Sequence, residues 1–301
     1  MTSLTHTHLG PARHGITKSP TDCRSRQRLT EAYHTALRVP FDDHTPLVIF
    51  SDHHRGDRSR LDPFAANHDL FVRALRRYYD QGFSYIEAGD GDELWKSWRF
   101  DDIERAHSQV FDLLHRFQRQ DRLHLLYGNH EELAAGGYQQ DKGGLPAREA
   151  VVLERLRTSQ RLFVVHGHQA DPRNDKKTQW SRRFVRYLWT PVQSSGLASL
   201  SGSVHPVSFG ATETISQRIE AWAAVQRQLV ICGHTHRPVF ARPGAAPYFN
   251  SGACLHPGQI TGIEIAGGHI QLVRWFAAAA GSASTVRRHC VTPPVPLDAY
   301  C

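Results

Sequence analysis

Five short apolar runs, each ending abruptly at polar residues, constrain the fold of this chain more than any other feature. The runs are Leu47–Phe50, Phe83–Ala88, Leu123–Tyr127, Leu162–Val165 and Leu229–Cys232. Short apolar runs that stop at glycine-containing segments are typical of buried strands. Apolar residues at helical spacing lie between some of these runs, over 64–78, 103–117 and 215–225. Strands that alternate with helices predict βαβ units, so the fold class is α/β.

Polar side chains suited to metal binding follow each of the five predicted strands. They are Asp52, His54, Asp90, Asn129, His130, His166, His168, His234 and His236. In open α/β sheets ligands bind beyond the carboxyl ends of the strands, so we expect these groups to converge on one site. Residues i and i+2 of an extended segment point the same way, which lets a D-x-H or H-x-H pair present two ligands together.

The ligand types indicate a catalytic metal site rather than a structural one. Carboxylate, imidazole and amide groups are present without thiolates, and such sets suit manganese, iron or zinc. The groups are too numerous for one catalytic ion. Two divalent transition-metal ions about 3.5–4 Å apart, sharing one carboxylate, would use them. Such a pair lowers the pKa of a bridging water and holds phosphoryl oxygens during displacement, which predicts phosphoester hydrolysis by a metal-bridging hydroxide.

Taken in order, the five segments resemble the motifs of the calcineurin-like metallophosphoesterases. The matching segments are Asp52-x-His54, Gly89-Asp90, Gly128-Asn129-His130-Glu131, His166-Gly-His168 and Gly233-His-Thr-His236, within 46–276. The resemblance implies a four-layer αββα sandwich with a helical insertion and a dinuclear site at the edge of two sheets. Of the ions that suit these ligands we expect manganese, with iron or zinc as alternatives.

The resemblance assigns a role to each matching residue. Metal ligands would be Asp52, His54 and His236 for one ion, Asn129, His166 and His234 for the other, and Asp90 as the bridge. His130 would contact the phosphate and donate a proton to the leaving oxygen. The residues alone do not separate His166 from His168, and the family pattern selects the first.

Residues that neighbour the motifs have roles suggested by chemistry alone. Arg55 and Arg237 are expected to bind phosphate oxygens of the substrate. Glu93 and Trp95 follow the bridging carboxylate and are candidates to line the pocket. Strand alternation points His53 away from the metals. Cys232, inside an apolar run, is expected to be a core residue.

The ends of the chain differ in composition from the middle. From their composition, we expect residues 1–40 to form a mobile N-terminal arm and residues 277–301 to form a poorly ordered tail. The metallophosphoesterase domain would then span residues 41–276. Within it, 172–228 is a helical insertion with basic and aromatic residues at helical spacing. The insertion has three alternative roles: it packs on the sandwich, it caps the active site, or it contacts the membrane surface through 176–190.

Charge and cysteine content bear on partners and compartment. The net charge of +7 is explained by solvated arginines, and no nucleic-acid-binding module is visible, so nucleic acid is not an expected partner. Five scattered cysteines fit a reducing compartment. With no apolar stretch of membrane-spanning length and no secretory signal, we expect a cytoplasmic protein, peripheral to the membrane if the insertion binds lipid.

The substrate is indicated less directly than the chemistry. The segments GHTHRPVF, NSGAC and ITGIEI most resemble the UDP-2,3-diacylglucosamine hydrolase branch, which cleaves a pyrophosphate in a lipid-linked nucleotide. This favours a phosphorylated small molecule or a lipid-linked phosphoester or pyrophosphate as the substrate. A Ser/Thr protein phosphatase and a non-catalytic scaffold with the same fold are the alternatives. Because every motif position holds a competent ligand, the enzyme is favoured over the scaffold.

Overall fold

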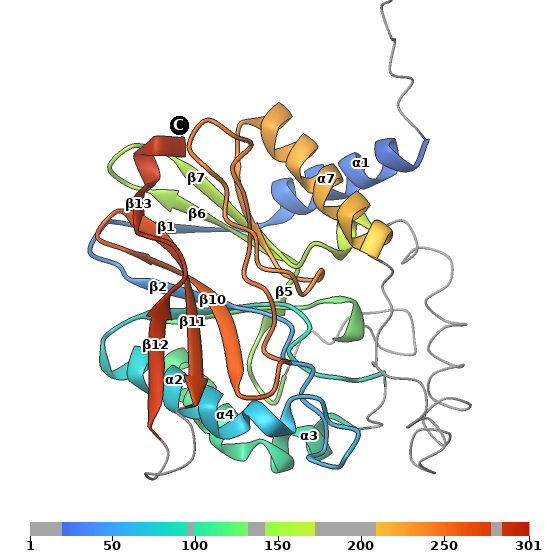
Figure 1. The fold of residues 1–301 in the computed structure, drawn as a ribbon, viewed down its shortest axis with the longest axis vertical. Helices are drawn as coiled ribbons and strands as arrows, with labels where there is room; N and C mark the ends of the chain where they lie inside the picture. The colour runs from blue at the N-terminus through green and yellow to red at the C-terminus, as the bar shows by residue number, and fades with distance from the viewer. Residues whose placement is uncertain (1–19, 96–98, 132–141, 172–208, 278–284, 301) are drawn as a thin grey trace, which may run out of the picture.

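A computed structural model of the chain describes residues 20–95, 99–131, 142–171, 209–277 and 285–300 (Figure 1). The helices are α1 Pro20–Thr35, α2 His68–Asp80, α3 Phe100–Ala106, α4 Ser108–Gln118 and α7 Phe209–Gln226. The strands are β1 Leu37–Phe41, β2 Leu47–Phe50, β3 Ser84–Ala88, β4 Leu123–Leu126, β5 Ala147–Arg148, β6 Ala150–Arg155, β7 Arg161–Val165, β8 Leu229–Cys232, β9 Tyr248–Asn250, β10 Gln259–Ala266, β11 His269–Ala277, β12 Val286–Cys290 and β13 Val295–Pro296.

Two sheets form the middle of the molecule. One has the strand order β1-β6-β7-β8-β9, and the other has the order β12-β11-β10-β2-β3-β4-β5 with β13 beside β11. The inner strands β2, β3 and β4 run parallel, as do β7, β8 and β9. Parallel strands carry their carboxyl ends to one edge, so the polar segments that follow them are brought together by the topology.

Helices cover the outer face of each sheet, which completes the four-layer αββα sandwich that the sequence predicts. Helices α2 and α4 pack on the larger sheet and share a core with it, while α1 and α7 share a core with the smaller sheet (Figure 1). A third core lies between the two sheets. No helix among the described ranges is long and apolar enough to cross a membrane.

The unbroken apolar runs are explained by burial on both faces. In β2, Val48 and Phe50 face the helices, whereas Leu47 and Ile49 face the other sheet. Strand β8 alternates in the same way, and its last residue, Cys232, packs beneath the helices. Burial raises the pKa of this thiol to about 12, so it is the core residue that the sequence predicts.

One predicted helix is divided in two. The apolar stripe over 103–117 belongs to α3 and α4, which meet at His107 with φ −114° and ψ 31°. The buried His107 ring lies between two partners, with Nε2 2.8 Å from Asp62 Oδ2 and Nδ1 2.9 Å from His68 Nδ1. The break covers a single residue, and the apolar side chains of both helices still face the same core. The spacing of apolar residues in the sequence therefore does not reveal it.

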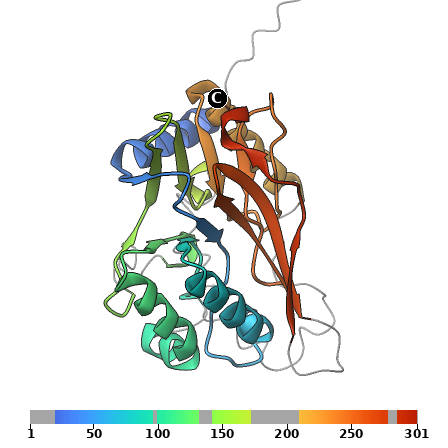
Figure 2. The same ribbon diagram turned by 90° about the vertical axis from the view of Figure 1, so that its left-hand side faces the viewer.

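Both ends of the chain differ from the expectation in their described parts. The predicted arm at 1–40 contains α1 and β1, and Leu29 and Ala32 of α1 are buried. The predicted tail at 277–301 adds β12 and β13 to the sheet beside β11, along one side of the molecule (Figure 2). Strand β12, with the sequence VRRHC, is held by backbone pairing, which composition does not reveal. Of the insertion at 172–228, residues 172–208 lie outside the described residues, and these include 176–190.

Candidate metal centre

The loops that follow β2, β3, β4, β7 and β8 meet at one edge of the sandwich. Backbone hydrogen bonds join the β2 loop to the β3 loop, from Asp52 N to Gly89 O at 3.1 Å and from His54 N to Asp90 O at 2.9 Å. Another joins the β8 loop to the β7 loop, from Gly233 N to His166 O at 3.0 Å. This arrangement produces three groups of side chains, and within each group the ligand atoms lie within 4.8 Å of one another. They are Asp52–His54–His236, Asp90–His166–His234 and His54–Asp90–His130.

The first group gathers the residues predicted to hold one ion. Asp52 Oδ1 lies 3.1 Å from His236 Nε2 and 3.8 Å from His54 Nε2. The two imidazole nitrogens are themselves 3.3 Å apart. A carboxylate oxygen and two ring nitrogens therefore point at one small volume, as the ligands of a divalent ion do.

Asp90 connects the first group to the second. Its Oδ2 atom lies 3.1 Å from His166 Nε2 and 3.7 Å from His54 Nε2. Asp90 thus lies between the two groups, and it is the residue that the family resemblance assigns as the bridging carboxylate. Asn129 Oδ1 is buried and has no hydrogen-bond partner among the described residues. A buried amide oxygen without a donor is costly, and a cation would satisfy it, so the residues fit divalent metal binding.

The backbone at the site is strained. Asp52, His54, Asp90, His234 and His236 all have φ between 49° and 66°, a region that L-residues other than glycine rarely adopt. Each such residue costs on the order of 1 kcal/mol, and strain of this kind concentrates at functional sites. Close approach also demands glycine, because a Cβ at Gly89 would lie 2.6 Å from the His166 ring.

The buried charges of the site depend on one another. Burial alone would raise the pKa of Asp90, but the neighbouring His166 holds it well below its usual value. Burial would likewise raise the pKa of Asp52, and His236 lowers it instead. In turn, burial would lower the pKa of His166, and Asp90 raises it to about 9. The site thus keeps its carboxylates ionised, which is the form that binds a metal.

His130 is held on three sides. Its backbone N–H donates to Asp90 Oδ1 at 2.9 Å, and its Nδ1 lies 2.9 Å from Glu93 Oε1. The Trp95 ring stacks on it at a centroid distance of 4.0 Å, and Trp95 Nε1 donates to Asn129 O at 3.1 Å. Glu93 and Trp95 therefore lie at the site, and both contact the predicted proton donor.

The remaining predicted residues lie in different surroundings. His168 lies outside the three groups, with its ring 5.4 Å from that of His166. His53 packs against Phe71 at a ring distance of 4.6 Å, away from the metal ligands, as strand alternation predicts. The side chain of Arg55 is fully buried in ion pairs beneath the site, so we do not carry it into substrate binding. Arg237 is exposed directly after His236.

Two contacts of the ligands have no signal in the sequence. Asp171 Oδ2 lies 3.6 Å from His234 Nε2, at the end of the short helix η3 (His168–Ala170). Ser51 donates a hydrogen bond of 2.6 Å to Asp52 Oδ2. Carboxylates and hydroxyls that contact ligand side chains fix their orientation. Neither residue occurs at a spacing that marks it as functional.

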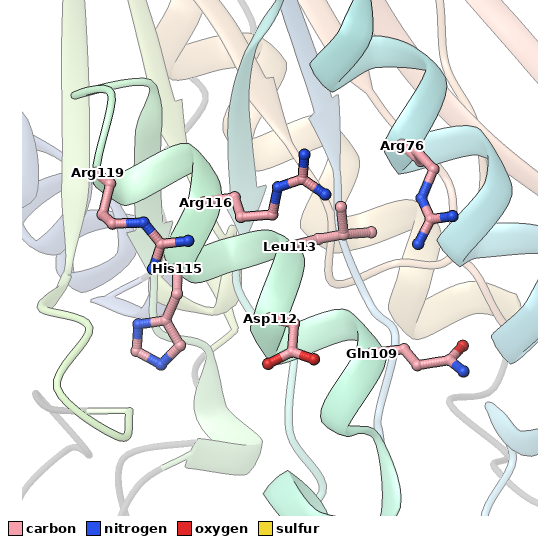
Figure 3. Close-up of a pocket in the computed structure, with 7 residues that line it drawn as sticks. All are labelled: Arg76, Gln109, Asp112, Leu113, His115, Arg116 and Arg119. Carbon is pink, nitrogen blue, oxygen red and sulfur yellow. The ribbon is translucent and has the colours of Figure 1, made fainter.

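A cavity of about 400 Å³ lies elsewhere on the molecule (Figure 3). Its lining comes from the outer helices α2 and α4 and the residue after α4, and includes Arg76, Arg116 and Arg119. None of the predicted metal ligands lines it. The metal centre is consequently identified by its converging side chains and not by the size of a pocket.

A family model described as the calcineurin-like phosphoesterase superfamily domain matches residues 46–270, a range that contains every predicted ligand. The chain belongs to this superfamily. The two-sheet sandwich and the order of the ligand loops are therefore those of a calcineurin-like phosphoesterase domain. Among curated proteins, none matches the chain.

Solved structures match the chain at low similarity. Vps29 of Cryptosporidium parvum is 11% identical with a TM-score of 0.41, covering 82% of this chain and 98% of its own. Vps29 of Entamoeba histolytica complexed with zinc is 14% identical with a TM-score of 0.39, covering 82% and 99%. The sulfate thiohydrolase SoxB of Thermus thermophilus is 14% identical with a TM-score of 0.29, covering 85% and 58%. At such scores, no functional conclusion follows from these similarities.

Proposed function

We propose that this calcineurin-like phosphoesterase is a hydrolase of phosphoester or pyrophosphate bonds that works with two divalent metal ions. The observation that supports it most is the convergence of two ligand groups on Asp90. The buried Asn129 amide oxygen, which has no hydrogen-bond partner among the described residues, adds to this support. Asp52, His54 and His236 would hold one ion. Asn129, His166 and His234 would hold the other. We propose manganese as the ion, with iron or zinc as alternatives.

The chemistry divides between the ions and the protein. When bound, a pair of divalent ions lowers the pKa of a water molecule and neutralises charge on the phosphoryl oxygens. The protein keeps the ligands ionised and close together in a buried setting, so little reorganisation is needed as charge develops. Arg237 is exposed beside His236, and we propose that its guanidinium binds a phosphate oxygen of the substrate.

His130 is the proposed proton donor to the leaving oxygen. Glu93 Oε1 lies 2.9 Å from Nδ1, and the tautomer that donates from Nδ1 to this carboxylate leaves Nε2 as the atom that would transfer a proton to the leaving oxygen. The buried carboxylate stabilises the doubly protonated ring that a general acid requires. Trp95 limits rotation of the ring by stacking on one face. Glu93 and Trp95 thus act as positioning residues for His130.

For the substrate we propose a small or lipid-linked phosphoester or pyrophosphate. The support comes from the sequence, through the resemblance of GHTHRPVF, NSGAC and ITGIEI to the UDP-2,3-diacylglucosamine hydrolase branch and through the basic and aromatic composition of the insertion. A peripheral membrane contact through 176–190 would suit a lipid-linked substrate and forms part of this proposal.

The test is a screen of the manganese-reconstituted protein against phosphomonoesters, phosphodiesters, nucleotide sugars, lipid-linked nucleotides and a phosphoserine peptide. Turnover of the small or lipid-linked compounds, lost in Asn129→Ala and retained in His168→Gln, is the expected result. His168 is the matched control because it is a buried histidine outside the ligand groups. Turnover of the peptide alone would support a protein phosphatase. Full metal binding with no turnover of any compound would support a scaffold.

A further inference from the structure

A network of buried charges lies directly beneath the metal centre. It consists of Arg55, Glu87, Asp92, Glu131 and Lys142, each with an exposed fraction of 0%. Charges buried to this degree are rare unless each is paired. Two of the members lie close to proposed ligands in the sequence, since Asp92 is two residues after Asp90 and Glu131 is two residues after Asn129.

Glu131 ties together two loops that carry ligands. Its Oε1 atom accepts hydrogen bonds from the backbone N–H groups of Gly91 at 3.0 Å and Asp92 at 3.2 Å. Its Oε2 atom accepts from Gly128 N at 2.6 Å. The Asp90 loop and the Asn129 loop are therefore fixed to one carboxylate, and its position sets the distance between their ligands.

Lys142 is the cation that reaches all three carboxylates of the network. Its ammonium contacts Glu131, lies 3.2 Å from Asp92 Oδ2 and lies 3.3 Å from Glu87 Oε1. An ammonium has three protons to donate, which matches the three carboxylates. The Lys142 backbone is anchored as well, because its N–H donates to Leu145 O at 2.9 Å.

The three carboxylates resemble a further cation site, and Lys142 fills it. Ligand atoms of Glu87, Asp92 and Glu131 lie within 4.8 Å of one another, a spacing that also suits a metal ion. The Lys142 ammonium contacts Glu131 and lies within 3.3 Å of oxygens of Asp92 and Glu87, so a cation already occupies the space between the three carboxylates.

We infer that Lys142 is a positioning residue for the metal centre, acting through Glu131 to hold the loops of Asp90 and Asn129 at metal-binding distance. This inference rests on the proposed function. It adds a residue that none of the five motifs contains. It also predicts that the Glu87–Asp92–Glu131 cluster takes no ion of its own in the native protein.

Cobalt titration of the metal-free protein, followed by visible absorption, tests the inference without reference to activity. Lys142→Met keeps the length of the side chain and removes its charge. We expect its cobalt affinity to be at least tenfold weaker than that of the wild-type protein. The matched control is Arg155→Met, because Arg155 is a buried cation paired with Asp43 and Asp298, neither of which lies in a ligand loop. It should lower the thermal unfolding temperature and leave the cobalt affinity unchanged.

The double variant Lys142→Met/Glu131→Gln covers the case in which Lys142→Met does not fold. It removes one cation and one carboxylate together, so the net charge of the network is the same as in the wild-type protein. The amide introduced in place of the Glu131 carboxylate cannot accept all three backbone hydrogen bonds. We therefore expect the double variant to have a higher unfolding temperature than Lys142→Met and still to bind cobalt more weakly than the wild-type protein. Wild-type affinity in either variant would overturn the inference alone. A wild-type protein that binds no cobalt would overturn the proposed function as well.

Discussion

Replacing Glu93 with Gln removes a negative charge beside His130 while keeping a hydrogen-bond acceptor of similar shape. The carboxylate is 1% exposed and lies 2.9 Å from His130 Nδ1, so solvent screens it little. Two unit charges about 4 Å apart at an effective dielectric constant near 20 interact by about 4 kcal/mol. If the whole interaction stabilises the protonated ring, the rate falls by at most roughly a thousandfold.

The leaving group decides whether this loss is observed. An alkyl alkoxide needs a proton as the bond to phosphorus breaks, whereas p-nitrophenolate leaves without one. We therefore expect Glu93→Gln to lower kcat/KM for an alkyl phosphoester by between tenfold and a thousandfold, and to change the value for the p-nitrophenyl ester little. The assay compares the two substrates side by side at saturating manganese.

This interpretation requires a measurement of metal content and a control variant. Metal content must be determined, because Glu93 Oε2 also lies 3.4 Å from Nδ1 of His54, a proposed metal ligand. Glu264→Gln is the control, since Glu264 is buried and paired with Arg288 at a distance from the ligand loops. An equal loss with both leaving groups, at unchanged metal content, would refute the role of His130 as a general acid.

Three further predictions concern the metals, the backbone and pH. Chelation should lower the unfolding temperature, and added manganese should raise it again, with a stabilisation that grows with the logarithm of the manganese concentration, because the ions bind only the folded ligands. An unfolding temperature insensitive to both would contradict this. Gly89→Ala should abolish metal binding and cost several kcal/mol, since its Cβ would lie 2.6 Å from the His166 ring, whereas Gly82→Ala, with φ of 80° and open space, should cost about 1 kcal/mol in denaturant unfolding. Burial and His107 lower the pKa of His68, so His68 takes up a proton less readily in the folded protein than in the unfolded chain, where the histidine pKa is about 6.5. The stability that neutral His68 contributes is therefore complete above the histidine pKa of the unfolded chain and is lost as the pH falls below it. His68→Gln should accordingly reduce the drop in unfolding temperature between roughly pH 7.5 and 5.

The parts of the fold that the sequence predicts well are those buried on both faces. Strands such as Leu47–Phe50 and Leu229–Cys232 match their apolar runs because every side chain meets a packed layer. The ligand loops are predicted for a related reason, since the residue types that bind metals occur where parallel strands end. The sequence does not predict strand β12 or the docking of helix α1, because backbone pairing and packing on a sheet leave little trace in composition.

Side-chain direction is the part of the site that residue types do not reveal. Arg55 follows His54 in the sequence, yet its guanidinium points into a buried network with Glu87 and Asp92. Asp171 and Lys142 are brought to the centre by tertiary packing, from segments without a motif. The residue types and their order along the chain thus indicate which loops meet. Tertiary packing decides which charged side chains face the candidate metal site and which lie in the buried network under the loops.

The most direct test of the central claim is a crystal structure of the manganese-loaded protein with anomalous scattering measured at the manganese edge. We predict two anomalous peaks about 3.5–4 Å apart, with Asp90 between them and Asn129 Oδ1 on one ion. A single peak, or a peak among Glu87, Asp92 and Glu131 in place of one beside Asp90, would contradict the dinuclear centre proposed for this protein.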